Sequence, residues 1–475
     1  MHIKSKIKKP VISIILSIFV FAVLSAFGFG LYTNRSINNT NITTSAAANT
    51  LADLNMDGIV NIQDLSILIS KWSTNSQPSD INKDGIVNIQ DLSILISGWG
   101  TVLNQTTEAF YSKYPDPFVD STTNLPVVMN GLNYRDVGRY SVPDQTAFNA
   151  VKSKGFNIMR FVIYWKDFET TKGQYNQVQM DRLDQAIAQA KTAGINVILD
   201  PIHAVNPSVQ PYFPTWAVSE AQANGWDSTE SVVNSGLPFL KMVANRYKNE
   251  KTVIAIDLVN EPNQFPNNGP WDSGSQVIDW NRLFATYNLL INEVRTIDSD
   301  KILLIEPNNG DVNPTNADFS LLTNKTNIVW SPHFYYAGGA DSDGYSASGW
   351  STGTNVADGT TGYPTVDRNS LDRHIAVHVD KMKSPTAQLP IHIGEYGIGD
   401  GSVEGQLPPP TNVPANHDQW LIDVKSVFDK YNLSRTAWEW TSRGTMSATY
   451  SKTGPNNING YPSSYTFKPC EDIIN

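Results

Sequence analysis

The chain has 475 residues, of which 40% are hydrophobic, and it includes 12 Trp and 19 Tyr. This length favours at least two domains, and these side chains can fill a sizeable core. The formal net charge of −10 argues against a nucleic-acid partner, which favours a basic surface. The single cysteine, Cys470, excludes an intramolecular disulfide, so stability must come from burial or from bound metal.

The N-terminal segment predicts export. Lysines at positions 4, 6, 8 and 9 precede an uncharged, mostly apolar run from Val11 to Tyr32. Such a run is typical of a secretory signal and is also long enough to span a bilayer. We therefore expect residues 1–33 to be a signal peptide, with a cleavage site near Ala26, or a membrane anchor. Either alternative makes the protein extracellular, secreted or held at the outer face of the membrane. A polar linker follows over residues 34–50.

Two copies of a repeat come next, "DLNMDGIVNIQDLSILISKW" from Asp53 and "DINKDGIVNIQDLSILISGW" from Asp80. Each copy has the spacing of an EF-hand calcium loop, with oxygen ligands alternating along the chain and glycine at the sharp turn. We expect about two calcium ions, and the alternative is a pair of Asx-rich turns without metal. The predicted ligands are Asp53, Asn55, Asp57, the Ile59 carbonyl, Asn61 and Asp64, then Asp80, Asn82, Asp84, the Ile86 carbonyl, Asn88 and Asp91.

After each loop, apolar residues recur at helical spacing, and we expect the two stripes to bury each other. The stripes are Leu65, Leu68, Ile69 and Trp72, then Leu92, Leu95, Ile96 and Trp99. Paired calcium loops that each have only an exiting helix resemble the dockerin module over residues 51–100. The resemblance implies calcium binding and docking onto a cohesin. The chain departs from the family because Ile69–Ser70 and Ile96–Ser97 stand where a basic pair is often found. A calcium-stiffened spacer, or docking to another partner, therefore stays open.

Residues 101–124 are expected to be a second linker, and residues 125–475 to form one large domain. Apolar runs of strand length alternate there with amphipathic helical stretches, which predicts a (β/α)₈ TIM barrel of the α/β class. A doubly wound open sheet is the alternative, but no Gly-rich phosphate loop follows the first strand. The predicted strands are "PVVMNGLNY", "NIMRFVIY", "NVILDPIH", "VIAIDLVNEP", "KILLIEPN", "NIVWSPHFY", "PIHIGEYG" and "TAWEWTS".

Several of these strands end in residues that can do chemistry. Because the carboxyl ends of barrel strands surround the active site, the side chains at these ends are expected to converge. Each one alone has a structural explanation, but the whole set predicts a site. The candidates are Arg160, His203, Asn260, Glu261, His333, Tyr335, Glu395 and Trp438.

This ordered set resembles glycoside hydrolase family 5, from about Leu125 to Arg443. "NEP" matches the family's acid/base motif and "GEYG" its nucleophile strand, with "MRFVIYW", "PIH", "HFYY" and "AWEW" in the expected order. The resemblance implies a retaining enzyme with Glu261 as acid/base and Glu395 as nucleophile, and it implies no catalytic cofactor. The chain departs from the family after Arg443, where no clear eighth helix follows.

The resemblance also suggests roles for the other candidates. Arg160 and Tyr335 hold the charge of the nucleophile, His203 and His333 shape the same subsite, Asn260 binds the sugar 2-hydroxyl, and Trp438 stacks on a pyranose ring. Three further acids are expected to matter less. Glu306 is a substrate contact or a supporting group, Glu439 faces away from the pocket, and Asp200 is structural.

The sequence thus predicts an endo-β-1,4-glucanase that acts on a β-glucan such as cellulose, with a β-mannanase as the alternative. A carbohydrate-binding scaffold, or an assembly protein that docks through the calcium repeats, belongs to another class of function. The presence of both glutamates disfavours the scaffold, and the set of residues at the strand ends disfavours a purely assembling role.

Overall fold

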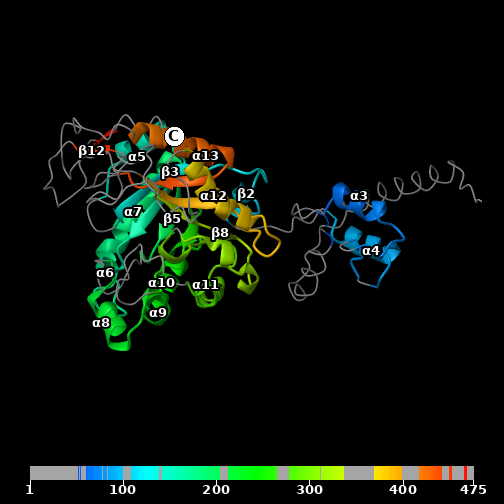
Figure 1. Cartoon of the computed structure of the whole chain (residues 1–475), viewed down its shortest axis with the longest axis horizontal. Coiled ribbons are helices and arrows are strands. Elements are labelled where there is room, and N and C mark those ends of the chain that lie inside the picture. Colours follow the sequence, from blue (N-terminus) through cyan, green and yellow to red (C-terminus); the bar gives the residue numbers. More distant parts are fainter. Residues whose placement is uncertain are drawn as a thin grey trace, which may run out of the picture. The chain divides into compact units, whose positions relative to one another are not determined.

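The computed structural model describes residues 52, 54, 60–76, 79–82, 84–99, 108–137, 142–203, 212–264, 278–310, 312–335, 368–397, 417–440, 449–451 and 465–467. The chain divides into two compact units, Met1–Gln105 and Thr106–Asn475, which are described separately (Figure 1). The expected export segment and first linker, residues 1–50, lie outside the described part. Within that part, no helix is both long and apolar enough to cross a membrane.

The described part of the first unit contains two short helices, α3 (Ile62–Ser70) and α4 (Ile89–Ser97). Each begins at an asparagine, Asn61 or Asn88, whose side chain accepts a backbone N–H, while an aspartate three residues later bonds back to the asparagine N–H. This reciprocal capping box satisfies two donors that a helix start otherwise leaves open. The small core is built from Ala52, Leu54, Val60, Leu68, Ile81, Val87, Leu92 and Leu95.

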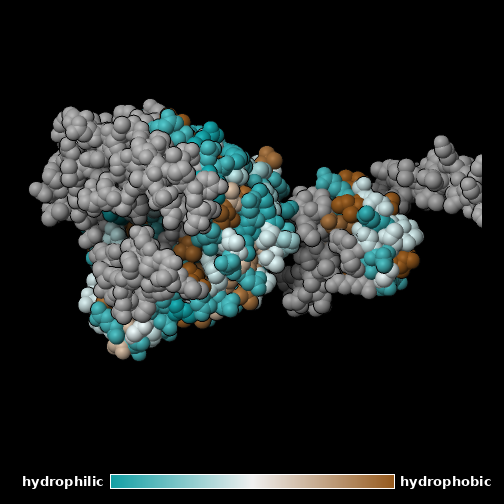
Figure 2. Space-filling view, viewed as in Figure 1, coloured by the Kyte–Doolittle hydropathy of each residue, from teal (hydrophilic) through white to brown (hydrophobic). Residues whose placement is uncertain are grey.

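The prediction that both apolar stripes are buried is only half right. Leu68 and Leu95 are fully buried, but Trp72 and Trp99 at the helix ends are 39% and 38% exposed. The helices are too short for the whole stripe to meet a partner, and the loop residues Val60 and Val87 fill the remaining core. Hydrophobic residues therefore stay at the surface of this unit (Figure 2).

The second unit is a closed parallel barrel. The strands are β3 (Asn130–Val137), β4 (Ile158–Ile163), β5 (Asn196–Asp200), β6 (Val253–Asp257), β7 (Ile302–Ile305), β8 (Ile328–Trp330), β9 (His333–Phe334), β10 (His392–Tyr396) and β11 (Ser434–Ala437). Their order is β8-β7-β6-β5-β4-β3-β11-β10-β9. Only two residues separate β8 from β9, so the two are halves of one strand. β8 pairs with β7 and β9 with β10, which closes eight strands into the predicted (β/α)₈ barrel.

Helices follow most of the strands and lie outside them (Figure 1). They are α5 (Gln145–Ser153), α6 (Trp165–Phe168), α7 (Gln177–Ala193), α8 (Thr215–Asn224), α9 (Ser228–Ser231), α10 (Leu237–Tyr247), α11 (Trp280–Arg295), α12 (Arg368–Met382) and α13 (His417–Lys430). The described connections also include a π turn, η1 (Val232–Gly236), and the 3₁₀ turns η2 (Asn308–Gly310), η3 (Pro314–Asn316) and η4 (Phe319–Leu321).

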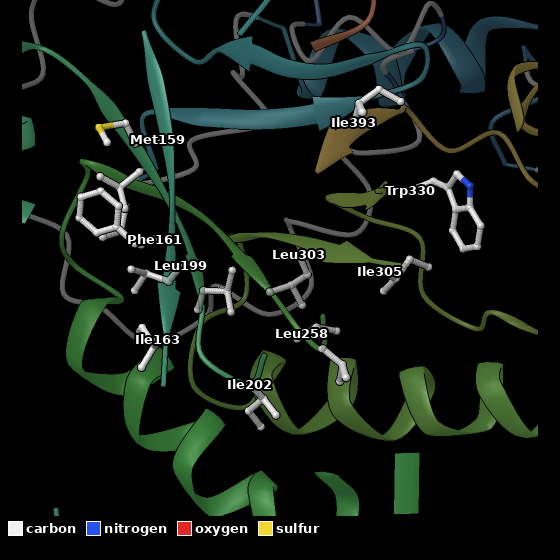
Figure 3. Packing of buried hydrophobic residues seen from close by; sticks show 14 of the residues in the cluster. Met159, Phe161, Ile163, Leu199, Ile202, Leu258, Leu303, Ile305, Trp330 and Ile393 are labelled. Carbon is white, nitrogen blue, oxygen red and sulfur yellow. The ribbon is translucent and has the colours of Figure 1, made fainter. Parts of the chain in front are cut away.

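Alternation along each strand separates two apolar layers. On β4, Met159, Phe161 and Ile163 belong to the cluster between strands and helices, whereas Ile158 belongs to the cluster inside the barrel. Figure 3 shows the outer layer, in which side chains from several strands lie against the neighbouring helices. Because successive side chains alternate, Arg160 falls on the same inner face as Ile158.

The linker prediction for residues 101–124 is wrong over part of its length. β1 (Phe110–Lys113) and β2 (Asp116–Asp120) form an antiparallel hairpin. Phe110 and Phe118 from this hairpin pack into the inner cluster of the barrel. The two strands are too short to stand out in the sequence, and contact with the barrel interior stabilises them. Beyond β11, the described elements are two paired strands, β12 (Thr449–Ser451) and β13 (Tyr465–Phe467).

Candidate active site

The eight residues predicted from the strand ends lie at the carboxyl end of the barrel. Arg160 and Glu395 are within β4 and β10, and His333 begins β9. The other five lie just beyond their strands, because each apolar run ends in polar residues that continue into a loop. Those five are His203, Asn260, Glu261, Tyr335 and Trp438.

Two hydrogen-bond donors hold the Glu395 carboxylate in place. Nη1 of Arg160 donates to Oε1 at 2.8 Å, and the Tyr335 hydroxyl donates to Oε2 at 2.7 Å. Glu395 reaches them because the pairing of β10 with β11 is irregular. Ile393 is opposite Arg435 but Tyr396 is opposite Ala437, so β10 has one extra residue there. Such a bulge re-aims a side chain, which lets Glu395 face the barrel mouth although Ile393 and Tyr396 face the helices.

The other glutamate, Glu261, has an unusual backbone. Its φ of 45° lies in the left-handed region, which is uncommon for a residue other than glycine. Its N–H donates to Oε2 of Glu306 at 2.6 Å, and its Oε1 is 2.8 Å from Nδ1 of His333. Gly310 makes room for this arrangement, because a Cβ there would lie 2.9 Å from the same His333 nitrogen.

The two glutamates are close together. One carboxylate oxygen of each, together with a ring nitrogen of His333, all lie within 4.8 Å of one another. Three such ligands can in principle hold a metal ion. The Glu395 oxygens already accept hydrogen bonds from a guanidinium and a phenol, which suits an anion that is held ready to react rather than a metal ligand.

Arg160 is the centre of a buried charge network. Besides Glu395 it contacts Asp257 at 3.0 Å, Asp200 at 3.2 Å and Glu306 at 3.3 Å, and it is fully buried. Burial alone would lower the pKa of the guanidinium, but these carboxylates raise it well above its usual value. The arginine is thus permanently charged, and the acids surrounding it outnumber the cations.

His333 lies among three carboxylates. Its Nε2 is 3.1 Å from Oε1 of Glu306, and its Nδ1 is 3.7 Å from Oε2 of Glu395 in addition to its contact with Glu261. Burial would lower the pKa of this imidazole, but Glu306, Glu395 and Glu261 raise it well above the usual value. The carboxylates around His333 therefore favour the charged form of its ring, whereas burial opposes it.

The remaining predicted residues line the same mouth. Nδ1 of His203 pairs with Asp200 at 2.7 Å, and its ring stacks on half-buried Trp438 with centroids 5.8 Å apart. Asn260 accepts from Arg160 through its side-chain oxygen. Its amide nitrogen has no hydrogen-bond partner within the described part of the chain. This amide is the donor that remains for a ligand.

Sequence reasoning missed two members of the site and gave a third too little weight. Asp257 and Asn133 both contact Arg160, and a polar residue on the inward phase of an apolar strand was the available signal. Glu306 is wholly buried between Glu261 and His333. By contrast, Glu439 pairs with Arg135 at 3.1 Å.

The second calcium-type loop lies in the small unit. Gly85 has a φ of 94°, and its N–H and that of Asp84 donate to the carboxylate of Asp80. Asp91 is fully buried and accepts the N–H groups of Asn82 and Asn88. Both carboxylates thus accept backbone N–H groups of the loop. In the first copy Asn61 and Asp64 repeat this capping, whereas Asp53, Asn55, Asp57 and Ile59 lie outside the described residues.

The fold and the carboxylate pair together define a class of protein. A parallel barrel whose carboxyl end carries two close glutamates has the features of a glycoside-cleaving enzyme. The chain belongs to glycosyl hydrolase family 5, since the model of that family, described as cellulase, matches residues 120–444. The model of the dockerin type I domain matches residues 51–99, ahead of the catalytic region.

Individual curated proteins match the chain at low identity and over part of its length. The chain is 25% identical over 267 residues to an endoglucanase of Paenibacillus polymyxa, covering 49% of this chain and 62% of the relative. It is 32% identical over 120 residues to a probable glucan 1,3-beta-glucosidase A of Aspergillus niger, covering 25% and 28%. The matches therefore span less than two thirds of these relatives.

Solved structures agree in fold. Endo-glycoceramidase II from Rhodococcus sp., in complex with a cellobiose-like isofagomine, superimposes with a TM-score of 0.53 at 18% identity. The match covers 77% of this chain and 81% of that one.

Proposed function

We propose that the chain is a retaining endo-β-1,4-glucanase that cleaves a β-glucan such as cellulose by double displacement. The distance within the carboxylate pair carries the proposal. Retaining glycosidases hold their two carboxyl groups about 5–5.5 Å apart, whereas inverting enzymes need roughly 6.5–9.5 Å to admit a water. Oxygens of Glu261 and Glu395 that lie within 4.8 Å of each other favour retention.

The contacts assign a role to each glutamate. Glu395 accepts from Arg160 and Tyr335, which stabilise an anion, so it is the group that attacks the anomeric carbon. Glu261 accepts no such pair of donors through its carboxylate and contacts His333, so it is the group that gives a proton to the leaving oxygen. A covalent glycosyl–Glu395 ester forms as the glycosidic bond breaks.

In the second half-reaction Glu261 takes a proton from water, which attacks the anomeric carbon and releases Glu395. The unpartnered amide of Asn260 is available to the sugar 2-hydroxyl, a contact that strengthens in the transition state. Trp438, half-buried at the mouth beside His203, offers a ring face on which a pyranose can stack.

The choice of substrate rests on relatives. The P. polymyxa relative is named an endoglucanase, as is a Xanthomonas campestris protein that is 33% identical over 100 residues. Both names favour a β-glucan. A β-mannanase stays the alternative, and reducing-sugar release from soluble β-glucan, mannan, xylan and xyloglucan separates the two.

Azide rescue tests the two roles. Glu395→Ala and Glu261→Ala should each lose nearly all hydrolysis of an aryl β-cellobioside. Azide should restore turnover in both, giving the α-glycosyl azide from the first variant and the β-glycosyl azide from the second. Glu293→Gln on α11 is the matched control, because this partly exposed glutamate pairs only with Lys241 among described side chains. Exchanged azide anomers would reverse the roles, and an α-configured hydrolysis product at early times would overturn retention.

We further propose that the dockerin module binds about two calcium ions and docks onto a cohesin-like partner outside the cell. Its surface supports the docking, since both helices leave apolar side chains exposed in equivalent positions. These are Ile62, Ile69 and Trp72 on the first copy, and Ile89, Ile96 and Trp99 on the second.

Calorimetric titration of the full chain tests the metal. Wild type should bind about two calcium ions, and Asp91→Ala about one, because the second loop loses a buried ligand. Asp372→Ala, on α12 of the barrel, controls for a general loss of negative charge. A flat titration of the wild type would contradict the calcium proposal.

A further inference from the structure

Glu306 occupies a place that the double displacement does not explain. It follows β7 directly, and its side chain is completely buried. One oxygen accepts the Glu261 N–H, and the other faces both His333 and Arg160. A buried carboxylate is costly unless its contacts are needed. All the contacts of this carboxylate lead to residues of the site.

The first contact supports the backbone of Glu261. A non-glycine residue with positive φ is strained, and it persists only where its surroundings hold it. At 2.6 Å, the hydrogen bond from the Glu261 N–H to Glu306 is short. The acid/base side chain is therefore aimed by a residue 45 positions away.

The second contact orients His333. With Nε2 held by Glu306 at 3.1 Å, the ring presents Nδ1 to Glu261 at 2.8 Å. A partner on one ring nitrogen decides the protonation of the other. Glu306, His333 and Glu261 thus form one continuous chain of hydrogen bonds that ends at the acid/base oxygen.

We propose that Glu306 is a positioning residue for the acid/base, acting through the Glu261 N–H and through His333. This inference rests on the proposed function. Burial and Asp257 raise the pKa of the Glu306 carboxyl, whereas His333 and Arg160 lower it. As the partner of Nε2, Glu306 favours the form of His333 that carries a proton on both nitrogens and so a positive charge beside Glu261.

Among the described residues, the charged groups that face His333 and Glu306 come from several strands. His333 is faced by Glu261 from the loop after β6, by Glu306 after β7 and by Glu395 on β10. Glu306 is faced by Arg160 on β4 and Asp257 on β6. The Tyr287 hydroxyl on α11 bonds only to the Glu306 backbone among described groups, at 2.9 Å. Tyr287 therefore supports the backbone of Glu306 without a hydrogen bond to its carboxylate.

Glu306→Gln in the full chain separates charge from structure. The amide keeps the size of the side chain and an acceptor for the Glu261 N–H. It has no negative charge, however, that would favour a proton on Nε2 of His333. Losing a cation beside the acid/base should move the alkaline limb of kcat/KM upward by roughly 1–3 pH units. Tyr287→Phe should lower the melting temperature and leave this limb in place, and Glu306→Asp should restore the limb in part.

The leaving group gives an independent readout. Cellotetraose needs a proton on its leaving oxygen, whereas 2,4-dinitrophenyl β-cellobioside does not. We expect Glu306→Gln to lower kcat/KM roughly 10–100-fold for the first substrate, a part of the usual worth of an acid catalyst, and about threefold or less for the second.

Each outcome decides something. If the wild type cleaves neither substrate, the proposed function is wrong. An active wild type, with equal losses on both substrates in Glu306→Gln or an unmoved alkaline limb, overturns the positioning role alone. If Glu306→Gln does not fold, ¹⁵N spectra of histidine-labelled wild type still decide the matter. An imidazolium at pH 7 supports the proposal, and a neutral His333 ring refutes it.

Discussion

A buried ion pair between Lys301 and Glu108 ties the segment before the hairpin to the barrel. Lys301 precedes β7 and is fully buried, and its ammonium donates to Glu108 at 2.5 Å and to the Val253 carbonyl at 2.9 Å. Glu108 lies two residues before β1. Glu108→Ala therefore leaves a buried cation whose remaining carboxylate partner, Asp298, is 3.9 Å away. Breaking such a pair costs about 3–5 kcal/mol, a large part of the roughly 5–15 kcal/mol that stabilises a typical domain.

The pair is nevertheless a poor stabiliser on its own. Burial raises the pKa of Glu108 although Lys301 opposes the rise, so desolvation exceeds the attraction between the two groups. Replacing both with apolar residues removes the desolvation of both charges. We expect Glu108→Leu with Lys301→Met to recover at least half of the stability that Glu108→Ala loses.

Urea unfolding at pH 7 measures these changes, with catalytic activity as a check on the native state. Asp380→Ala is the matched control, because the Lys383–Asp380 pair is exposed (58% and 69%) and should contribute less than about 1 kcal/mol. If Glu108→Ala costs no more than this control, or if the double variant is worse than the single one, the reasoning is refuted.

Two further predictions concern activity and pH. Gly310→Ala should lower kcat at least tenfold with a smaller change in KM. The reason is that a Cβ at this position would lie 2.9 Å from His333 and displace this histidine, which contacts Glu261. Unchanged kinetics would contradict this close approach. Burial lowers the pKa of both His378 and His392 to about 3, below the usual 6.5. As the pH falls, these histidines therefore bind protons in the unfolded chain at a higher pH than in the folded chain. Stability should fall from about pH 6.5 toward pH 3, by roughly 2 kcal/mol per histidine at pH 5, and equal urea midpoints at pH 7 and pH 5 would disprove it.

Much of the barrel and its mouth was predictable because the relevant signals are local. The strand pattern brought Arg160 into the set of residues expected to converge, and the polar end of each apolar run placed Asn260 and Glu261 at the carboxyl edge. Neither inference needs knowledge of a distant residue. The order of these strands along the chain then makes the strand ends neighbours.

What could not be predicted depends on contacts between segments far apart in sequence. The hairpin at residues 110–120 forms because the barrel interior accepts Phe110 and Phe118. The orientation of Glu395 depends on an extra residue in the pairing of β10 with β11, which no alternation rule shows. The role of Glu306 becomes visible only when β6 and β7 lie side by side.

The separation of the catalytic carboxylates therefore depends on two local irregularities. The bulge on β10 turns Glu395 toward the barrel axis, and the left-handed φ of Glu261 turns its side chain toward the same point. A regular strand end at either position would aim the carboxyl elsewhere and would change the distance that favours retention over inversion. Arg160 holds the first carboxylate and Glu306 holds the backbone of the second, and these two residues contact each other at 3.3 Å. One buried network thus contacts both the carboxylate of the proposed nucleophile and the backbone of the proposed acid/base.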